Sequence, residues 1–102
     1  MKRNEIISAL RAHEAELKQA GVTSLSLIGS TARGDDRPDS DVDIVVRLTE
    51  EARSGGFAYF GRVDRLRQRL ESILARHVDL IAEPIHKERL RRDVEKDRLL
   101  AF

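Results

Sequence analysis

Two aspartates in one short segment have the spacing most suited to chemistry. Asp41 and Asp43 lie two positions apart in DSDVDIVVRL, and the β-branched residues around them predict a strand over residues 41–48. Because side chains alternate along a strand, both carboxylates face the same side, roughly 7 Å apart along the chain. Neighbouring carboxylates repel each other, and a hard cation such as Mg²⁺ relieves the repulsion. The pair therefore predicts a divalent metal site.

A glycine-bounded turn precedes this strand. Gly29 and Ser30 follow a predicted strand over residues 22–28, in which leucine and serine alternate. A glycine lets a phosphate group approach the main chain, and the hydroxyl and N–H after it can bind that phosphate. Arg33 follows closely and could neutralise a polyphosphate. The plainer alternative is that Gly29-Ser30 is only a turn and that the two aspartates are the solvated face of an edge strand.

A third carboxylate occupies another predicted strand. Asp79 lies within VDLIA, residues 78–82, which Pro84 ends. If this strand neighbours the strand over residues 41–48, three carboxylates can converge and hold two metal ions about 4 Å apart. Taken alone, Asp79 could equally be a solvent-facing strand residue.

The spacing of these residues resembles a known signature. Gly29-Ser30, then ten residues, then Asp41-Val42-Asp43 is similar to the pattern of the DNA polymerase β-like nucleotidyltransferase superfamily. More narrowly, GSTARG followed by SDVDIVV resembles the minimal nucleotidyltransferases that prokaryotes encode beside HEPN-domain proteins. The resemblance extends from Leu25 to Asp79.

The resemblance implies a reaction and a partner. Gly29 and Ser30 would bind the nucleoside triphosphate, while Asp41, Asp43 and Asp79 would be the catalytic carboxylates that hold Mg²⁺, as two ions. The nucleotide would be ATP, and AMP would be transferred to a tyrosine hydroxyl of a HEPN-domain toxin. The chain would thus be the antitoxin of a toxin–antitoxin pair.

Two other functions stay open at this point. One is an antitoxin that neutralises its HEPN partner by binding alone, and the other is a nucleotidyltransferase with a small-molecule or RNA acceptor. The chain is short for building an acceptor pocket by itself, so we expect a protein partner to supply that surface. For Phe57 and Phe60, packing in the core is the favoured role. The candidate partner contacts are Phe57, Tyr59, Phe60, Leu99, Leu100 and Phe102.

The elements needed to position these residues can be predicted from periodicity. Apolar residues at helical spacing predict helices, and alternation or β-branched runs predict strands, separated by turns over 29–40 and a polar loop over 49–56. The order suggests one domain over residues 1–102, of the α/β (α+β) class, with helices packed on a small mixed sheet. The predicted helices span 4–20, 57–73 and 87–100, and the predicted strands span 22–28, 41–48 and 78–82.

Composition excludes several classes of protein. Nineteen basic and eighteen acidic residues give a net charge of +1, so binding nucleic acid directly is not expected. The five arginines of residues 62–76 fit a solvated helix face better than a binding patch. There is no cysteine for a disulfide or a thiolate ligand. No segment has the length of a membrane helix and no secretory leader is recognisable, so we expect a cytoplasmic location.

Overall fold

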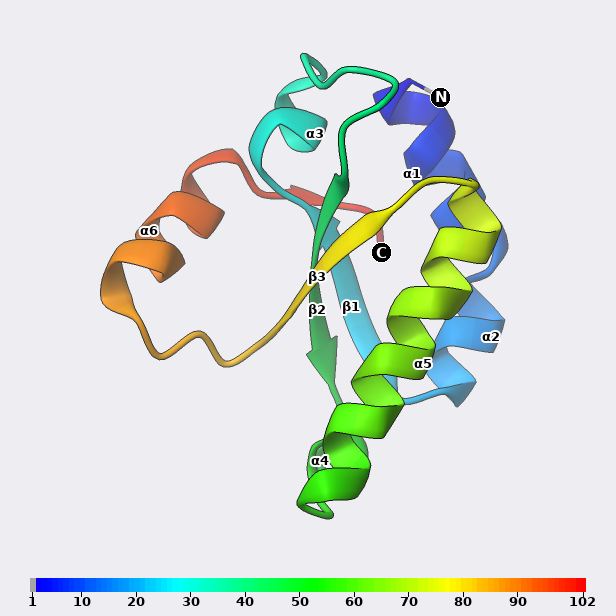
Figure 1. Ribbon diagram of the computed structural model, residues 1–102, viewed down its shortest axis with the longest axis vertical. Coiled ribbons are helices and arrows are strands. Elements are labelled where there is room, and N and C mark those ends of the chain that lie inside the picture. The colour runs from blue at the N-terminus through cyan, green and yellow to red at the C-terminus, as the bar shows by residue number, and fades with distance from the viewer. Residues whose placement is uncertain (1) are drawn as a thin grey trace.

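The computed structural model describes residues 2–102. Their strands form one four-stranded sheet of order β3-β2-β1-β4, with helices packed against it (Figure 1). Strand β1 runs antiparallel to β2 and to β4, whereas β3 is parallel to β2. The strands are β1 (Val22–Leu27), β2 (Val42–Leu48), β3 (Val78–Ala82) and β4 (Leu99–Leu100). The helices are α1 (Arg3–Ala12), α2 (Glu14–Gln19), α3 (Gly29–Arg33), α4 (Glu50–Arg53), α5 (Phe57–Leu74) and α6 (Glu88–Asp97). This mixed sheet with packed helices confirms the predicted architecture.

Strand β2 separates two apolar cores. On one face, Ile44 belongs to the larger core together with Leu10 of α1 and Leu70 of α5. On the other face, Val45 packs in a smaller core with Val94 of α6. Because successive side chains of a strand point to opposite faces, the helices bury both sides of the middle of the sheet. At the end of the sheet where β2 and β3 begin, Asp43 and Asp79 occupy neighbouring positions.

Helix α5 confirms the predicted helix but corrects the role of two aromatic residues. Its buried stripe is Leu66, Leu70 and Leu74, one residue every four. Phe57 and Phe60, for which core packing was favoured, are instead 95% and 67% exposed. The first turns of α5 lie beside α4, at the end of the sheet where β2 finishes (Figure 1). The apolar residues of α5 thus keep their helical spacing as far as Phe57, but the core beneath the helix does not extend to its first turns.

Three other elements differ from the sequence-based prediction. The helix over residues 4–20 is interrupted at His13, where α1 ends and α2 begins. The polar loop over residues 49–56 contains α4, which starts because the Thr49 hydroxyl accepts a hydrogen bond from the Ala52 N–H, 3.2 Å away. The last predicted helix ends at Asp97 and is followed by β4, which pairs with Ser26 and Leu27 of β1. A strand of two residues is too short to show a periodicity.

Within the described residues 2–102, no helix is long and apolar enough to cross a membrane.

Candidate active site

Two of the predicted site residues are direct neighbours across the sheet. The parallel pairing of β2 and β3 places Asp43 opposite Asp79, on strands that lie about 4.8 Å apart. Asp41 is exposed and comes immediately before β2. The Val42 N–H donates to the carbonyl of His77 at 2.9 Å, so β2 and β3 begin together. The sequence left open whether these two strands are neighbours. The structure pairs them, and this pairing places Asp43 and Asp79 side by side at one end of the sheet.

The carboxyl of Asp43 is partly buried and close to other acidic side chains. Burial raises the pKa of the Asp43 carboxyl above its usual range, and the negative charges of Asp79, Asp41 and Asp36 raise it further. The carboxylates are therefore close enough to repel one another. A bound cation would remove this repulsion, which is the chemical property expected of a metal site.

The donor set fits a hard divalent cation in kind. All three predicted ligands, Asp41, Asp43 and Asp79, offer carboxylate oxygens, which Mg²⁺ prefers. Among residues 2–102, no three acidic or histidine side chains are yet grouped closely enough to hold an ion by themselves. Because Mg²⁺ commonly uses one or two carboxylates plus substrate phosphates, the residues present fit a metal that binds with the nucleotide.

The turn after β1 is in contact with the carboxylate of Asp43. Gly29 has a φ of +58°, and a Cβ at this position would lie 3.2 Å from Oδ2 of Asp43. A glycine is required here both for the left-handed backbone and for the close approach. Ser30 follows in the first turn of α3, where N–H groups have no partner within the helix. The predicted phosphate-binding turn and the predicted metal ligand therefore adjoin each other.

Thr31 is a site residue that the sequence analysis missed. Its side chain is fully buried, and its hydroxyl accepts a hydrogen bond from the Asp43 N–H at 3.1 Å. The Ile28 N–H donates to the Asp43 carbonyl at 3.1 Å, so α3 and the turn before it hold both polar groups of the Asp43 backbone. A polar residue directly after Gly29-Ser30 was the only signal in the sequence.

Arg33 is engaged away from the aspartates of β2 and β3. Its guanidinium donates to Asp97 at 2.8 Å and to Asp35 at 3.2 Å. Hydrogen bonds to Asp97 and Asp35 raise the pKa of Arg33. The predicted role of Arg33 in binding a polyphosphate would require these contacts to be exchanged for contacts with phosphate.

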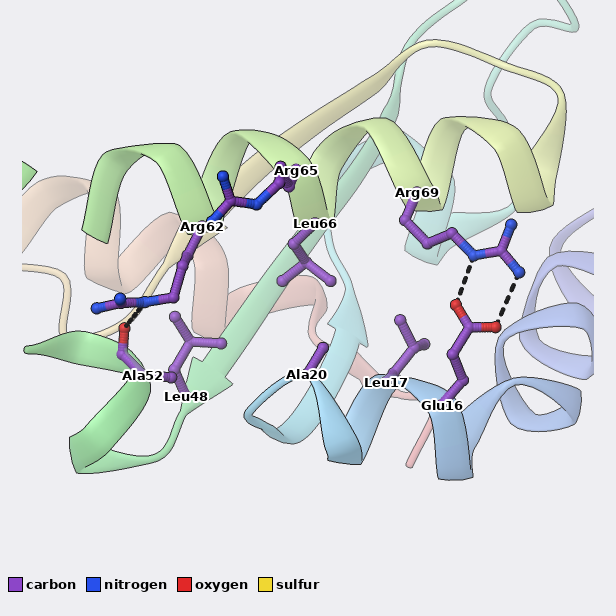
Figure 2. A pocket seen from close by; sticks show the side chains of 9 residues that line it. All are labelled: Glu16, Leu17, Ala20, Leu48, Ala52, Arg62, Arg65, Leu66 and Arg69. Carbon is purple, nitrogen blue, oxygen red and sulfur yellow. Dashed lines mark hydrogen bonds and ion pairs between the residues drawn. The ribbon is translucent and has the colours of Figure 1, made fainter. Parts of the chain in front are cut away.

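The arginines of residues 62–76 do not form one solvated face. Arg67 pairs with Asp64 and Glu71 on its own helix, while Arg76 is buried against the loop between α3 and β2. The other three, Arg62, Arg65 and Arg69, lie along a groove between α5, α2 and α4 (Figure 2).

This groove is at the end of the sheet opposite the aspartates. Its volume is about 190 Å³, and its apolar lining includes Leu17, Leu48 and Leu66 (Figure 2). Glu16 pairs with Arg69 at one side, while Arg62 donates to the Ala52 carbonyl at the other (Figure 2). The lining of this groove is largely apolar, whereas the aspartates of β2 and β3 lie at the other end of the sheet.

Comparisons with known proteins identify the family of the chain. The profile of the nucleotidyltransferase domain family matches residues 10–101. The chain is 36% identical over 96 residues to MJ1379 of Methanocaldococcus jannaschii, a proposed protein adenylyltransferase, covering 92% of each chain. It is 34% identical over 94 residues to the protein adenylyltransferase MntA of Thermococcus cleftensis, covering 91% of this chain and 89% of that protein.

Solved structures share the fold. The structure of a proposed minimal nucleotidyltransferase superposes with a TM-score of 0.78 at 28% identity, covering 97% of this chain and 95% of that one. A toxin–antitoxin structure with AMP-PNP superposes with a TM-score of 0.67 at 24% identity, covering all of this chain and 73% of that one. At that lower identity, the second likeness describes the fold alone.

Proposed function

Because this chain belongs to the nucleotidyltransferase domain family and is similar over nearly its whole length to protein adenylyltransferases, we propose that it is a Mg²⁺-dependent protein adenylyltransferase. In this proposal it transfers AMP from ATP to a tyrosine hydroxyl of a HEPN-domain toxin and so acts as the antitoxin. The observation that supports it most is the contact of Gly29 with Asp43, which itself pairs with Asp79.

Each site residue has a role in the proposed reaction. The turn at Gly29 and Ser30 binds the triphosphate through backbone N–H groups and the Ser30 hydroxyl. Asp41, Asp43 and Asp79 would hold Mg²⁺, which would supply neutralisation of the charge that develops on the phosphate oxygens. The nearness of Gly29 to the Asp43 carboxylate supports binding of the triphosphate beside the metal ligands.

The covalent step exchanges a phosphoanhydride bond of ATP for a phosphoester bond to the acceptor. The acceptor oxygen forms a bond to the α-phosphorus, and the bond from that phosphorus to the bridging oxygen of the β-phosphate breaks. Pyrophosphate leaves, and the hydroxyl proton passes to water or to a carboxylate of the site. Stabilising the charge that develops on the phosphate oxygens is the main catalytic requirement.

Similarity to other proteins is what supports a toxin as the partner of this chain. A toxin–antitoxin structure has the same fold, and the MntA relative is a protein adenylyltransferase. The exposed rings of Phe57 and Phe60 favour a second candidate function, an antitoxin that binds its partner without modifying it.

Intact-protein mass spectrometry separates the two functions. A copurifying HEPN-domain protein is incubated with ATP and Mg²⁺, with this chain, with its Asp43→Asn variant, or alone. We expect the partner to gain the mass of one or more AMP units only with the wild-type chain. Asp64→Asn, a change to an exposed aspartate of α5, is the matched control and should leave the mass gain intact. An unchanged partner mass in a stable complex would contradict the transferase and favour the binding-only antitoxin.

A further inference from the structure

Arg76 joins the two segments that contain the predicted metal ligands. It lies in the turn between α5 and β3, three residues before Asp79. Its Nη2 donates to the Ser40 carbonyl at 2.7 Å and to the Arg37 carbonyl at 3.0 Å. Ser40 is the residue directly before Asp41. The guanidinium of Arg76 is therefore bonded to the loop immediately before the start of β2.

The same nitrogen neutralises a buried carboxylate near the site. Nη2 of Arg76 lies 2.9 Å from Oδ2 of Asp36, and their side chains are only 9% and 7% exposed. Asp36 is close enough to Asp43 for its charge to act on that carboxyl. Without Arg76, a second buried negative charge would stand uncompensated beside the ligand set.

The geometry of Arg76 is poor for stability alone. All of its hydrogen bonds come from Nη2, while Nε and Nη1 are buried with no hydrogen-bond partner within the described residues 2–102. A buried ion pair is weak evidence for stability, and unsatisfied donors reduce its contribution further. These bonds do hold the loop between α3 and β2 in place. That loop is rich in aspartate, glycine and proline and has little regular structure of its own.

We propose that Arg76 is a positioning residue for metal binding: it holds the loop of residues 36–40 against the start of β3 so that Asp41 is presented beside Asp43 and Asp79. This inference rests on the proposed metal–nucleotide site. Residues that orient metal ligands typically change metal affinity 10- to 100-fold when they are altered.

The test compares two Arg–Asp ion pairs. One is the buried pair beside the proposed site, and the other is an exposed pair on α5. In Arg76→Met/Asp36→Asn, one positive and one negative charge are removed together, so the net charge beside the site is unchanged. The matched control is Arg67→Met/Asp64→Asn, which removes an exposed pair at 2.8 Å on α5. Mn²⁺ binding to the protein is measured by electron paramagnetic resonance with the ATP analogue AMP-PNP present, because the site fits a metal that binds together with the nucleotide. Unfolding is followed in denaturant.

The expected result is about tenfold weaker Mn²⁺ binding by the folded Arg76→Met/Asp36→Asn variant, with the control variant unchanged. A folded variant with wild-type Mn²⁺ affinity would overturn the inference and leave the metal site standing. If that variant does not fold, Arg76→Lys replaces it, because an ammonium keeps the charge but not the planar fork. Several-fold weaker binding then supports the inference, and wild-type affinity overturns it. If wild-type protein shows no Mn²⁺ binding that Asp43→Asn removes, the metal site itself fails, and the inference with it.

Discussion

The two ends of the sheet carry different kinds of side chain. One end holds an acidic residue in fixed geometry, and the other is next to exposed aromatic rings. At the end where β2 begins, the backbone of Asp43 is bonded to Thr31 and Ile28, and its carboxylate touches Gly29. At the end where β2 finishes, the start of α5 lies beside α4 (Figure 1). Phe57 and Phe60 in this part of α5 are exposed. Chemistry requires fixed geometry, whereas contact with a partner requires exposed apolar surface. The molecule therefore separates its proposed catalytic end from a face suited to binding.

The largest effect should come from neutralising the acidic end. Asp43→Asn removes a proposed metal ligand, and we expect AMP transfer to fall about 10³-fold or more, the scale of losing a main electrostatic contact in the transition state. Asp64→Asn on α5 should stay within twofold of wild type. Transfer is measured as radiolabelled AMP incorporated into the partner, and an Asp43→Asn variant with near wild-type transfer would remove the distinction between the two ends.

A methyl group added to one glycine at each end gives a matched pair. Gly29 and Gly56 both have a φ of +58°, but a Cβ would meet Asp43 Oδ2 at 3.2 Å in the first case and nothing within 4 Å in the second. Both alanine variants should lose about 1–3 kcal/mol of stability, because an L side chain rarely adopts a positive φ.

Only Gly29→Ala should also weaken nucleotide binding, because the added methyl occupies the space between the turn and Asp43. Binding of ATP with Mn²⁺ is measured by calorimetry. Equal binding by the two alanine variants would show that the close approach at Gly29 has no role in the site.

Thr31→Val tests the backbone constraint on Asp43. Valine has nearly the same shape but cannot accept the hydrogen bond from the Asp43 N–H, so a buried donor is left unpaired at a cost of about 1–3 kcal/mol. Thr31→Ser retains the hydroxyl and should lose less stability. The free energy of unfolding in denaturant is the measurement, and equal losses in both variants would mean that packing of the Thr31 methyl group matters more than the bond.

Changes at the opposite end should affect binding and not stability. Phe57→Ala and Phe60→Ala alter exposed rings, so the free energy of unfolding should change by no more than about 0.5 kcal/mol. If these rings contact the partner, affinity should fall about tenfold when either is removed. Titration of the partner with each variant is the measurement. Unchanged affinity in both would place the binding surface elsewhere.

The smallest effect is a dependence of stability on pH. Since the folded pKa of Asp43 is raised above its ordinary value of 3.8, its contribution to stability is fully present below that value and is lost as pH rises through the folded pKa. In metal-free buffer, Asp43→Asn should therefore be more stable than wild type at pH 7, and the difference should vanish below pH 3.8. Denaturant unfolding across this range is the measurement, and a variant less stable than wild type at pH 7 would contradict the raised pKa.

Local patterns in the sequence predicted β1, β2 and β3 but not the two-residue β4. Alternation placed Asp41 and Asp43 on one face, and VDLIA predicted β3 with its bounds as observed. The register that pairs Asp43 with Asp79 depends on the crossover through α5, and no local pattern specifies it.

The residues that the sequence analysis missed act through long-range contacts. Thr31 bonds a residue twelve positions away, and Arg76 reaches forty positions back to Asp36, so neither role is visible in a window of sequence. The aromatic residues show the converse error. The spacing of Phe57 and Phe60 with the leucines of α5 predicts a common face, but it does not reveal where the core beneath that face ends.

The most direct test of the central claim is a crystal structure of the chain with Mn²⁺ and a non-hydrolysable ATP analogue, in which anomalous scattering locates the metal. The account predicts a manganese peak bounded by Asp41, Asp43 and Asp79, with the triphosphate against Gly29 and Ser30. A metal bound away from these carboxylates, or a nucleotide seated in the groove between α2, α4 and α5, would contradict it.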